Sequence, residues 1–304
     1  NAARLGVGNQ SLGLTEVAYQ NALVYAKDRI QMRSLSGTKA KDKEADPIIV
    51  HPDVRKMLLT AKAYAEGGRA LQIFCTLLLD KEHHHPDEKV RKDAGELVAL
   101  LTPIVKAFIT DNGHISTNAC MQVFGGHGFI KEWGMEQFVR DNRINMIYEG
   151  TNTIQSLDLL GRKVLGNNGA TLKKFGKLIG ALVAEEGVNE KMAEFINPLA
   201  MLGEQMTKFT TELGFKGLQN PDEVGAAAVD YLRVAGHFVF GYLFARMAQV
   251  ALREIANGNT DPFYVAKLQT ARFYFAKLFP ETVTLMRTAR AGSKVLMDTD
   301  AALA

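Results

Sequence analysis

The chain has 304 residues and a formal net charge of +3 at pH 7, and 47% of its residues are hydrophobic. This length and apolar content predict a folded protein with a sizeable core. The nearly balanced charge excludes the strongly basic face by which proteins bind nucleic acid or anionic membranes. No apolar run in the sequence reaches the roughly 18 residues that a membrane-spanning helix needs.

Cys75 and Cys120 are the only cysteines. Their number and spacing exclude a disulfide scaffold and a cysteine-based metal framework. The run His83–His85 is interpreted as a solvated turn, because adjacent histidines rarely converge on one ion, so we expect no bound metal. The N-terminal residues Asn1–Arg4 contain no initiator Met and no signal-peptide core. We therefore expect part of a longer protein that is not secreted and that functions in the cytoplasm or the mitochondrial matrix.

Helical periodicity dominates the chain. Apolar residues between Val54 and Leu78 recur at steps of three and four, which predicts a helix that begins near Pro52–Asp53. Asn220–Glu223 combines a capping residue, a proline and two acids, as helix starts do, and the apolar stripe behind it ends at Asn257–Gly258. Thr260–Pro262 then opens another helix. No convincing period-two strand occurs, so the predicted fold class is all-α.

Two polar stretches interrupt these helices. Residues 34–46 are polar and charged and include Gly37, a composition typical of a surface loop. Gly166–Gly169 is small, polar and flexible, as domain boundaries are. We therefore predict two successive helical bundles, residues 1–166 and residues 169–304.

Three glycines follow an expected helix end in Gln122–Phe129. Glycines allow a backbone to approach a ligand closely and free its amide groups for binding, although simple helix termination explains the same pattern. The segment is not a dinucleotide fingerprint, because no strand precedes it and no βαβ unit follows.

Glu149 lies between an apolar, aromatic run and the glycine and threonine that open a helix. Flanking by Ile147 and Tyr148 is expected to desolvate the carboxylate partly, which suits a general base. The alternative is an exposed glutamate beside a helix N-terminus, where the helix dipole favours negative charge.

The order and spacing of these elements resemble the C-terminal signature of the acyl-CoA dehydrogenase family. The elements are Gln-x-x-Gly-Gly-x-Gly-Phe at residues 122–129, Arg140–Asp141, and Ile-Tyr-Glu-Gly-Thr at residues 147–151. Residues 1–8 and 26–29 resemble the first helix of the same bundle. The resemblance covers about residues 1–165, and the part after Gly169 resembles the helical extension of larger members.

The resemblance implies a flavoenzyme that converts acyl-CoA thioesters into trans-2-enoyl-CoA. Glu149 matches the base that removes the α-proton while the β-carbon passes a hydride to FAD. An acyl-CoA oxidase with the same base, or a non-catalytic helical interaction module with the same fold, are the alternatives. The family's amino-terminal helical domain and middle β-domain have no counterpart here, so we expect this chain alone to be inactive.

The resemblance also assigns substrate and flavin contacts. Arg4 matches an arginine near the base and the substrate, and Tyr148 and Gly150 match positions that border the acyl chain and thioester. Thr151 and Thr153 match positions that approach the FAD of their own subunit, although many members carry glutamine in place of Thr153.

A second set of matched residues implies contacts with the flavin of a neighbouring subunit. Arg29 matches the arginine that reaches the FAD pyrophosphate, and Gln122 and Gly126 match the element at the adenosine side. Gln31 matches a further pyrophosphate contact, although the family's Gln-Phe-Gly is Gln31-Met32-Arg33 here. The resemblance therefore implies at least a homodimer, with electron-transferring flavoprotein as the electron acceptor. The extension is expected to cover one face of the first bundle.

Overall fold

The computed structural model describes residues 2–303; Asn1 and Ala304, the outer ends of the two predicted bundles, lie outside the described residues. Within residues 2–303 the chain forms helices joined by turns and no strand, apart from one isolated bridge between Ile30 and Pro47. The predicted all-α fold class is confirmed.

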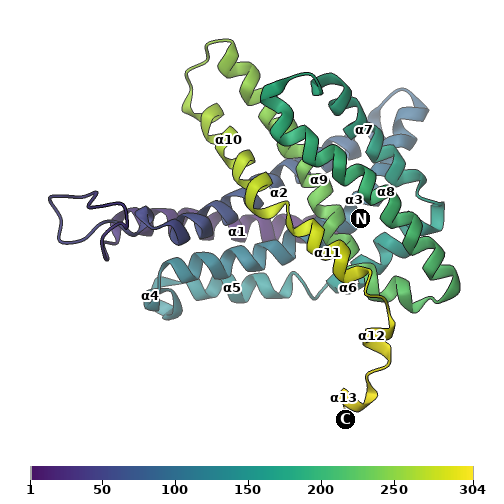
Figure 1. The fold of residues 1–304 in the computed structure, drawn as a ribbon, viewed down its shortest axis with the longest axis horizontal. Coiled ribbons are helices and arrows are strands. Elements are labelled where there is room, and N and C mark those ends of the chain that lie inside the picture. The colour runs from purple at the N-terminus through teal and green to yellow at the C-terminus, as the bar shows by residue number, and fades with distance from the viewer. Residues whose placement is uncertain (1, 304) are drawn as a thin grey trace.

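Three long helices and several shorter ones form the first part of the chain (Figure 1). They are α1 (Ala2–Asp28), η1 (Ile48–Val50), α2 (Pro52–His84), α3 (Glu88–Val123), α4 (Gly126–Phe129), η2 (Lys131–Trp133), α5 (Met135–Ile144) and α6 (Asn152–Leu157). Helices α1, α2 and α3 pack along one another, and α5 packs against α1 and α3. Helix α2 begins at Pro52, as the sequence predicts, because proline fits the first turn of a helix.

The rest of the chain forms a second group of helices. They are η3 (Asp158–Val164), η4 (Leu165–Asn167), α7 (Ala170–Glu186), η5 (Glu190–Met192), α8 (Ala193–Gln219), α9 (Asp222–Ala256), α10 (Pro262–Phe273), η6 (Tyr274–Leu278), α11 (Glu281–Ala289), α12 (Lys294–Met297) and α13 (Asp300–Leu303). Elements η3 and η6 are π-helical. The predicted start and end of α9 and the predicted start of α10 agree with the structure, and the Asp261 side chain caps α10 by accepting from Phe263 N.

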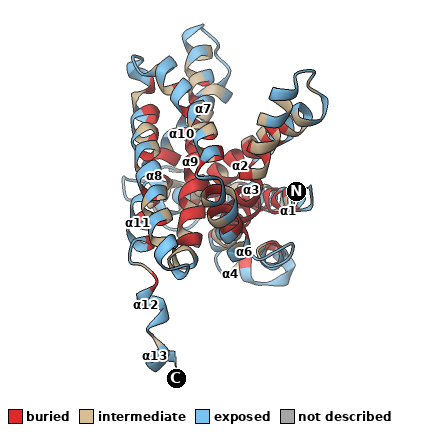
Figure 2. Cartoon of the chain, turned by 90° about the vertical axis from the view of Figure 1, so that its right-hand side faces the viewer, coloured by how far each residue is buried: buried red, intermediate tan, exposed pale blue. Residues whose placement is uncertain are grey.

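Helix α9 joins the two groups. It packs against α8, α10 and α11 on one side and against α2, α3 and α6 on the other, so its residues are buried along most of its length (Figure 2). A single apolar cluster includes residues of α1, α2 and α3 together with residues of α7 to α11. The extension therefore covers a face of the first bundle and shares its core. The division into two domains at residues 166–169 remains a prediction.

Close packing at the junction depends on Gly236 of α9. A Cβ atom at Gly236 would lie 2.3 Å from Cδ2 of Phe108 on α3, and the Phe108 ring is buried against His237 and Phe240. The two helices can approach this closely only because residue 236 has no side chain.

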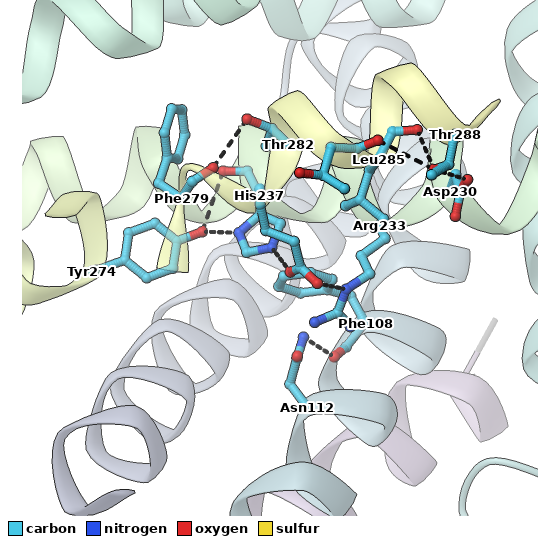
Figure 3. A network of polar contacts seen from close by, with 12 residues as sticks. Phe108, Asn112, Asp230, Arg233, His237, Tyr274, Phe279, Thr282, Leu285 and Thr288 are labelled. Carbon is cyan, nitrogen blue, oxygen red and sulfur yellow. Dashed lines mark hydrogen bonds and ion pairs between the residues drawn. The ribbon is translucent and has the colours of Figure 1, made fainter. Parts of the chain in front are cut away.

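A buried polar network lies next to this contact (Figure 3). His237 Nε2 lies 2.8 Å from Glu281 Oε2, His237 Nδ1 lies 2.9 Å from the Tyr274 hydroxyl, and Arg233 Nε donates to Glu281 Oε1 at 2.9 Å. Burial lowers the pKa of His237, and Glu281 only partly opposes this. Burial raises the pKa of Glu281, but hydrogen bonds from His237 and Arg233 outweigh it and bring the pKa to about 2. A neutral His237 that donates from Nε2 to an ionised Glu281 satisfies every group.

Replacement of Gly236 by alanine is expected to destabilise the fold. The added methyl overlaps a buried ring that has no room to move, and such overpacking costs about 1–3 kcal/mol. Urea unfolding followed by circular dichroism measures the loss. Gly225→Ala in the same helix is the matched control, because a Cβ there meets nothing within 4 Å and alanine favours a helix by about 0.5–1 kcal/mol. Equal stability of the two variants would contradict the packing argument.

Candidate active site

The α5–α6 loop (residues 145–151) carries the predicted base in an unusual backbone conformation. Glu149 has a φ of 58° and Gly150 a φ of 83°. A residue with a side chain pays about 1–3 kcal/mol for left-handed backbone, and such strain concentrates at functional sites. Glycine is needed at residue 150 for a second reason, since a Cβ there would lie 2.7 Å from Gln155 Nε2.

The side chain of Gln155 on α6 holds this strained turn by hydrogen bonds to its backbone. Its buried side chain donates from Nε2 to the carbonyl oxygens of Glu149 at 3.1 Å and Gly150 at 3.2 Å. Arg4 of α1 donates from Nη1 to Gln155 Oε1 at 3.0 Å and to Asp158 Oδ2 at 2.8 Å. The predicted substrate residue Arg4 is therefore connected to the turn of Glu149 through one intervening side chain.

The far end of the loop is fixed by Asn152, the first residue of α6. Its Oδ1 accepts from Lys106 Nζ at 2.8 Å, and its Nδ2 donates to Asp111 Oδ1 at 2.5 Å and to Thr110 Oγ1 at 2.9 Å. Its backbone N–H donates to Met146 O at 3.1 Å. Thus α3 contacts the loop directly from the core of the molecule.

The remaining predicted residues of this group surround the same turn. Tyr148 donates from its hydroxyl to Asn145 Oδ1 at 3.0 Å and also contacts Gln10. The Thr151 hydroxyl caps α6 by accepting from Ile154 N at 3.4 Å, and Thr153 is exposed on that helix.

Glu149 itself is exposed, and its neighbours Ile147 and Tyr148 are 45% and 36% exposed. The expectation that these two residues desolvate the carboxylate is wrong for this chain. Nearness in sequence to apolar residues therefore does not bury this carboxylate.

A second group of predicted residues meets around one cavity of about 530 Å³ at the other end of α1. Its walls include all four residues expected to contact a neighbouring flavin, namely Arg29, Gln31, Gln122 and Gly126. Aromatic packing joins the two chain segments there: the Tyr25 ring stacks on Phe124 at 4.1 Å, and the Tyr25 hydroxyl lies 2.9 Å from His127 Nδ1. The glycine turn is thereby pressed against the end of α1.

Asp46 organises the polar loop that follows Gln31 and Met32. Its buried carboxylate accepts from the backbone N–H groups of Ser34 at 2.9 Å, Lys39 at 2.9 Å and Ala40 at 2.7 Å. The hydrogen bonds from Ala40 and Ser34 lower the pKa of Asp46 to about 2, although burial opposes them. One carboxylate therefore gives a defined shape to a loop that has little regular structure.

The two groups lie far apart. Arg4 and Asp28 are separated by 24 residues of α1, which corresponds to about 36 Å at the rise of an α-helix. Within this chain, then, the residues around Glu149 and the residues around the cavity form two distinct sites.

Residues 1–165 match the family described as acyl-CoA dehydrogenase, C-terminal domain. The chain belongs to the acyl-CoA dehydrogenase family. Residues 175–300 match a second family, acetyl-CoA dehydrogenase C-terminal like. The resemblance drawn from the residue 122–151 elements is thus confirmed.

Curated relatives of the family match nearly the whole chain. A 3-methylmercaptopropionyl-CoA dehydrogenase of Ruegeria pomeroyi is 39% identical, with 92% of this chain aligned to 47% of that protein. The broad-specificity linear acyl-CoA dehydrogenase FadE5 of Mycobacterium tuberculosis is 31% identical, over 94% of this chain and 48% of its own length. The chain spans about half the length of the curated relatives that it matches.

Solved structures share the fold. The Caenorhabditis elegans protein ACDH-11 in complex with C11-CoA aligns with a TM-score of 0.73 at 18% identity, over 90% of this chain and 42% of that one. An acyl-CoA dehydrogenase of Bacillus anthracis complexed with FAD aligns with a TM-score of 0.72 at 20% identity, over 95% of this chain and 48% of that one. Within residues 2–303, no helix is long and apolar enough to cross a membrane. The same residues contain no group of three or more His, Cys, Asp or Glu side chains that could hold a metal ion.

Sequence reasoning missed several residues that shape the site. Gln155, Lys106 and Asn152 belong to no recognisable motif, and their long-range contacts span 41 to 151 residues in sequence. The one available signal was Lys106 itself, a lysine within the long apolar run of α3, since buried lysines occur almost only where they have a partner.

Asp46→Ala is expected to loosen the polar loop of residues 33–46. Loss of the carboxylate removes three backbone hydrogen bonds that hold the loop, so the rate of tryptic cleavage at Lys39, Lys41 or Lys43 should rise by at least about tenfold. Mass spectrometry of timed digests provides the measurement. Asp42→Ala, an exposed acid of the same loop, is the control and should digest like the wild type. Unchanged digestion of the Asp46 variant would contradict the assignment.

The stability contributed by Lys106 is expected to depend on pH. Burial lowers its pKa from 10.5 to about 8, although Asp111 and Glu149 oppose the shift. Between these values the unfolded chain binds the proton more tightly, so stability rises with pH through this window, by up to about 1.4 kcal/mol per unit. Below pH 8 the cost of the buried charge is fully present.

Urea unfolding between pH 7 and pH 10 tests this sign. The free energy of unfolding of wild type minus that of Lys106→Met should increase above pH 8. The corresponding difference for Lys92→Met, an exposed lysine of the same helix, should stay flat. A decrease for the Lys106 pair would show that the lysine is not held in an environment that disfavours its charge.

Proposed function

We propose that this chain forms the C-terminal part of an FAD-dependent enzyme that dehydrogenates acyl-CoA thioesters to trans-2-enoyl-CoA, with Glu149 as the base. The observation that carries the proposal is the strained turn at Glu149–Gly150. The surrounding structure holds it with Gln155 on one side and Asn152 on the other. Family membership supplies the reaction class, and the curated relatives named as acyl-CoA dehydrogenases support it.

Chemically, the turn presents two groups to one substrate. The Glu149 carboxylate accepts the α-proton, and the Glu149 backbone N–H is directed to the thioester oxygen, where negative charge develops as the proton leaves. Left-handed backbone at Glu149 and Gly150 turns the chain sharply, which separates the peptide N–H from helical bonding and leaves it for the substrate. Arg4, Tyr148 and Gly150 then border the acyl chain and the thioester.

The chain's own residues fit an anionic dinucleotide at the second site. The cavity is lined by the Arg29 side chain, two glutamine amides and the glycine turn at residues 125–126, a donor set suited to phosphate oxygens and polar adenosine groups. Bound FAD would supply the hydride acceptor for the β-carbon. Arg29, Gln31, Gln122 and Gly126 would hold the flavin of a neighbouring subunit, whereas Thr151 and Thr153 would approach that of their own.

The separation of the two sites supports a homodimer. The residues around Glu149 and the residues around the cavity lie about 36 Å apart along α1. They can serve the same kind of flavin site if each flavin is bound by residues from two subunits. Electron-transferring flavoprotein is proposed as the acceptor. The compartment is proposed to be the cytoplasm or the mitochondrial matrix.

Dehydrogenase and oxidase share this fold, since an acyl-CoA oxidase of Caenorhabditis elegans complexed with FAD and ATP aligns with a TM-score of 0.62 at 16% identity. The names of the relatives at 39% and 31% identity favour the dehydrogenase. Anaerobic bleaching of the flavin by acyl-CoA, followed by admission of oxygen or of electron-transferring flavoprotein, separates the two. Rapid reoxidation by oxygen alone would indicate the oxidase.

Glu149→Gln in the FAD-loaded enzyme is expected to retain flavin and lose turnover by about two to four orders of magnitude, because general-base catalysis contributes that much. Steady-state kinetics with acyl-CoA and a dye acceptor measures the loss. Glu190→Gln, at an exposed position of the extension, is the control. Turnover of the Glu149 variant near that of the wild type would remove the residue from its role.

A further inference from the structure

Lys106 is the one lysine among the fully buried side chains of the described residues. It lies on α3, and Asp111 and Glu149 are the negative charges that act on it. Burying an ammonium group is costly unless it has partners. The proposed chemistry of the previous section does not use it, so its placement calls for a separate explanation.

The hydrogen bonds of Asn152 depend on this lysine. Asn152 presents its oxygen to Lys106 and its amide nitrogen to Asp111 and Thr110. A flipped amide would place its N–H groups against the ammonium and its oxygen against the carboxylate. Because a lysine only donates and an ionised aspartate only accepts, the pair permits one orientation of the Asn152 side chain.

We propose that Lys106 is a positioning residue for the α5–α6 loop, acting through Asn152 to hold Glu149 where it can reach the α-proton. Asn152 begins α6 three residues after Glu149, and its backbone N–H also closes the loop onto Met146. Gln155 holds the carbonyl groups of the turn, while Lys106 fixes the point at which the turn joins the helix. This inference rests on the proposed role of Glu149.

The test uses the FAD-loaded enzyme that contains this chain. Lys106→Met keeps the length of the side chain and removes the donor; Asn152→Ala removes the group through which Lys106 acts. Each variant should lower kcat by about tenfold to a hundredfold, since a base displaced by about 1 Å loses rate on that scale. KM should change by less than about threefold, and the flavin content should equal that of the wild type. Lys92→Met is the control and should keep the wild-type kcat.

The double variant decides whether Lys106 acts through Asn152. If it does, Lys106→Met combined with Asn152→Ala should lose no more kcat than the worse single variant, because residues in one path are not additive. Losses that multiply, or a wild-type kcat in either single variant, would overturn the proposal. If Lys106→Met fails to retain flavin, Asn152→Ala alone decides: a lowered kcat at unchanged KM supports the positioning role, and an unchanged kcat overturns it.

The outcomes also separate this inference from the proposed function. Full activity of Lys106→Met together with an inactive Glu149→Gln enzyme overturns the positioning role and leaves the base in place. Activity that survives Glu149→Gln overturns both.

Discussion

The structure depends on the complete burial of α3 between residues 104 and 109. Helices α1 and α2 pack on one side of α3 and α9 packs on another, so this segment has no solvent-facing side. Successive residues in it serve different parts of the molecule: Lys106 holds the α5–α6 loop, whereas the Phe108 ring receives the glycine of α9. A shift of α3 along its axis would disturb the loop and the junction together, because close-packed interiors transmit displacement rather than absorb it.

Burial at this helix also explains why polar residues there occur in sets. Arg233 lies over the Phe108 ring and is paired with Glu281, which in turn accepts from His237. Burial raises the pKa of Asp111, and the charge of Arg233 is one of the groups that partly oppose this shift. The polar groups of the extension and those beside Asn152 are thus electrostatic neighbours across the α3–α9 contact. Low polarity around them strengthens each pairing and makes any unpaired member costly.

Local signals in the sequence predicted the helices well. Pro52 and Asp261 mark helix starts because a proline in the first turn and a capping carboxylate act within a few residues of themselves. The order of the glycine motif and the Tyr148–Thr151 segment was enough to identify the family. The four residues Arg29, Gln31, Gln122 and Gly126 line one cavity. They could be predicted as one group only from the family resemblance, because no local pattern in the sequence connects them.

The supporting contacts were beyond such signals. Gln155 and Lys106 have partners, Arg4 and Asn152, that only the tertiary fold brings near. The sequence around an isolated glutamine or lysine does not indicate which distant residue it contacts. The expectation about Glu149 failed for a related reason. Glu149 is exposed although Ile147 and Tyr148 precede it, because burial of a side chain depends on what the folded chain packs around it and not on its neighbours in sequence.

The length of α1 acquires a meaning from the two sites at its ends. The helix runs unbroken from Ala2 to Asp28, with Arg4 near its start and the cavity beyond its end. Removing one residue from an α-helix rotates everything after the deletion by about 100° and draws it in by 1.5 Å. Such a change would turn Arg29 away from the cavity or Arg4 away from Gln155. The length of α1 therefore sets the distance and the relative orientation of the two sites. We expect substitutions on its exposed side to be tolerated and insertions or deletions within it to disrupt one of the sites.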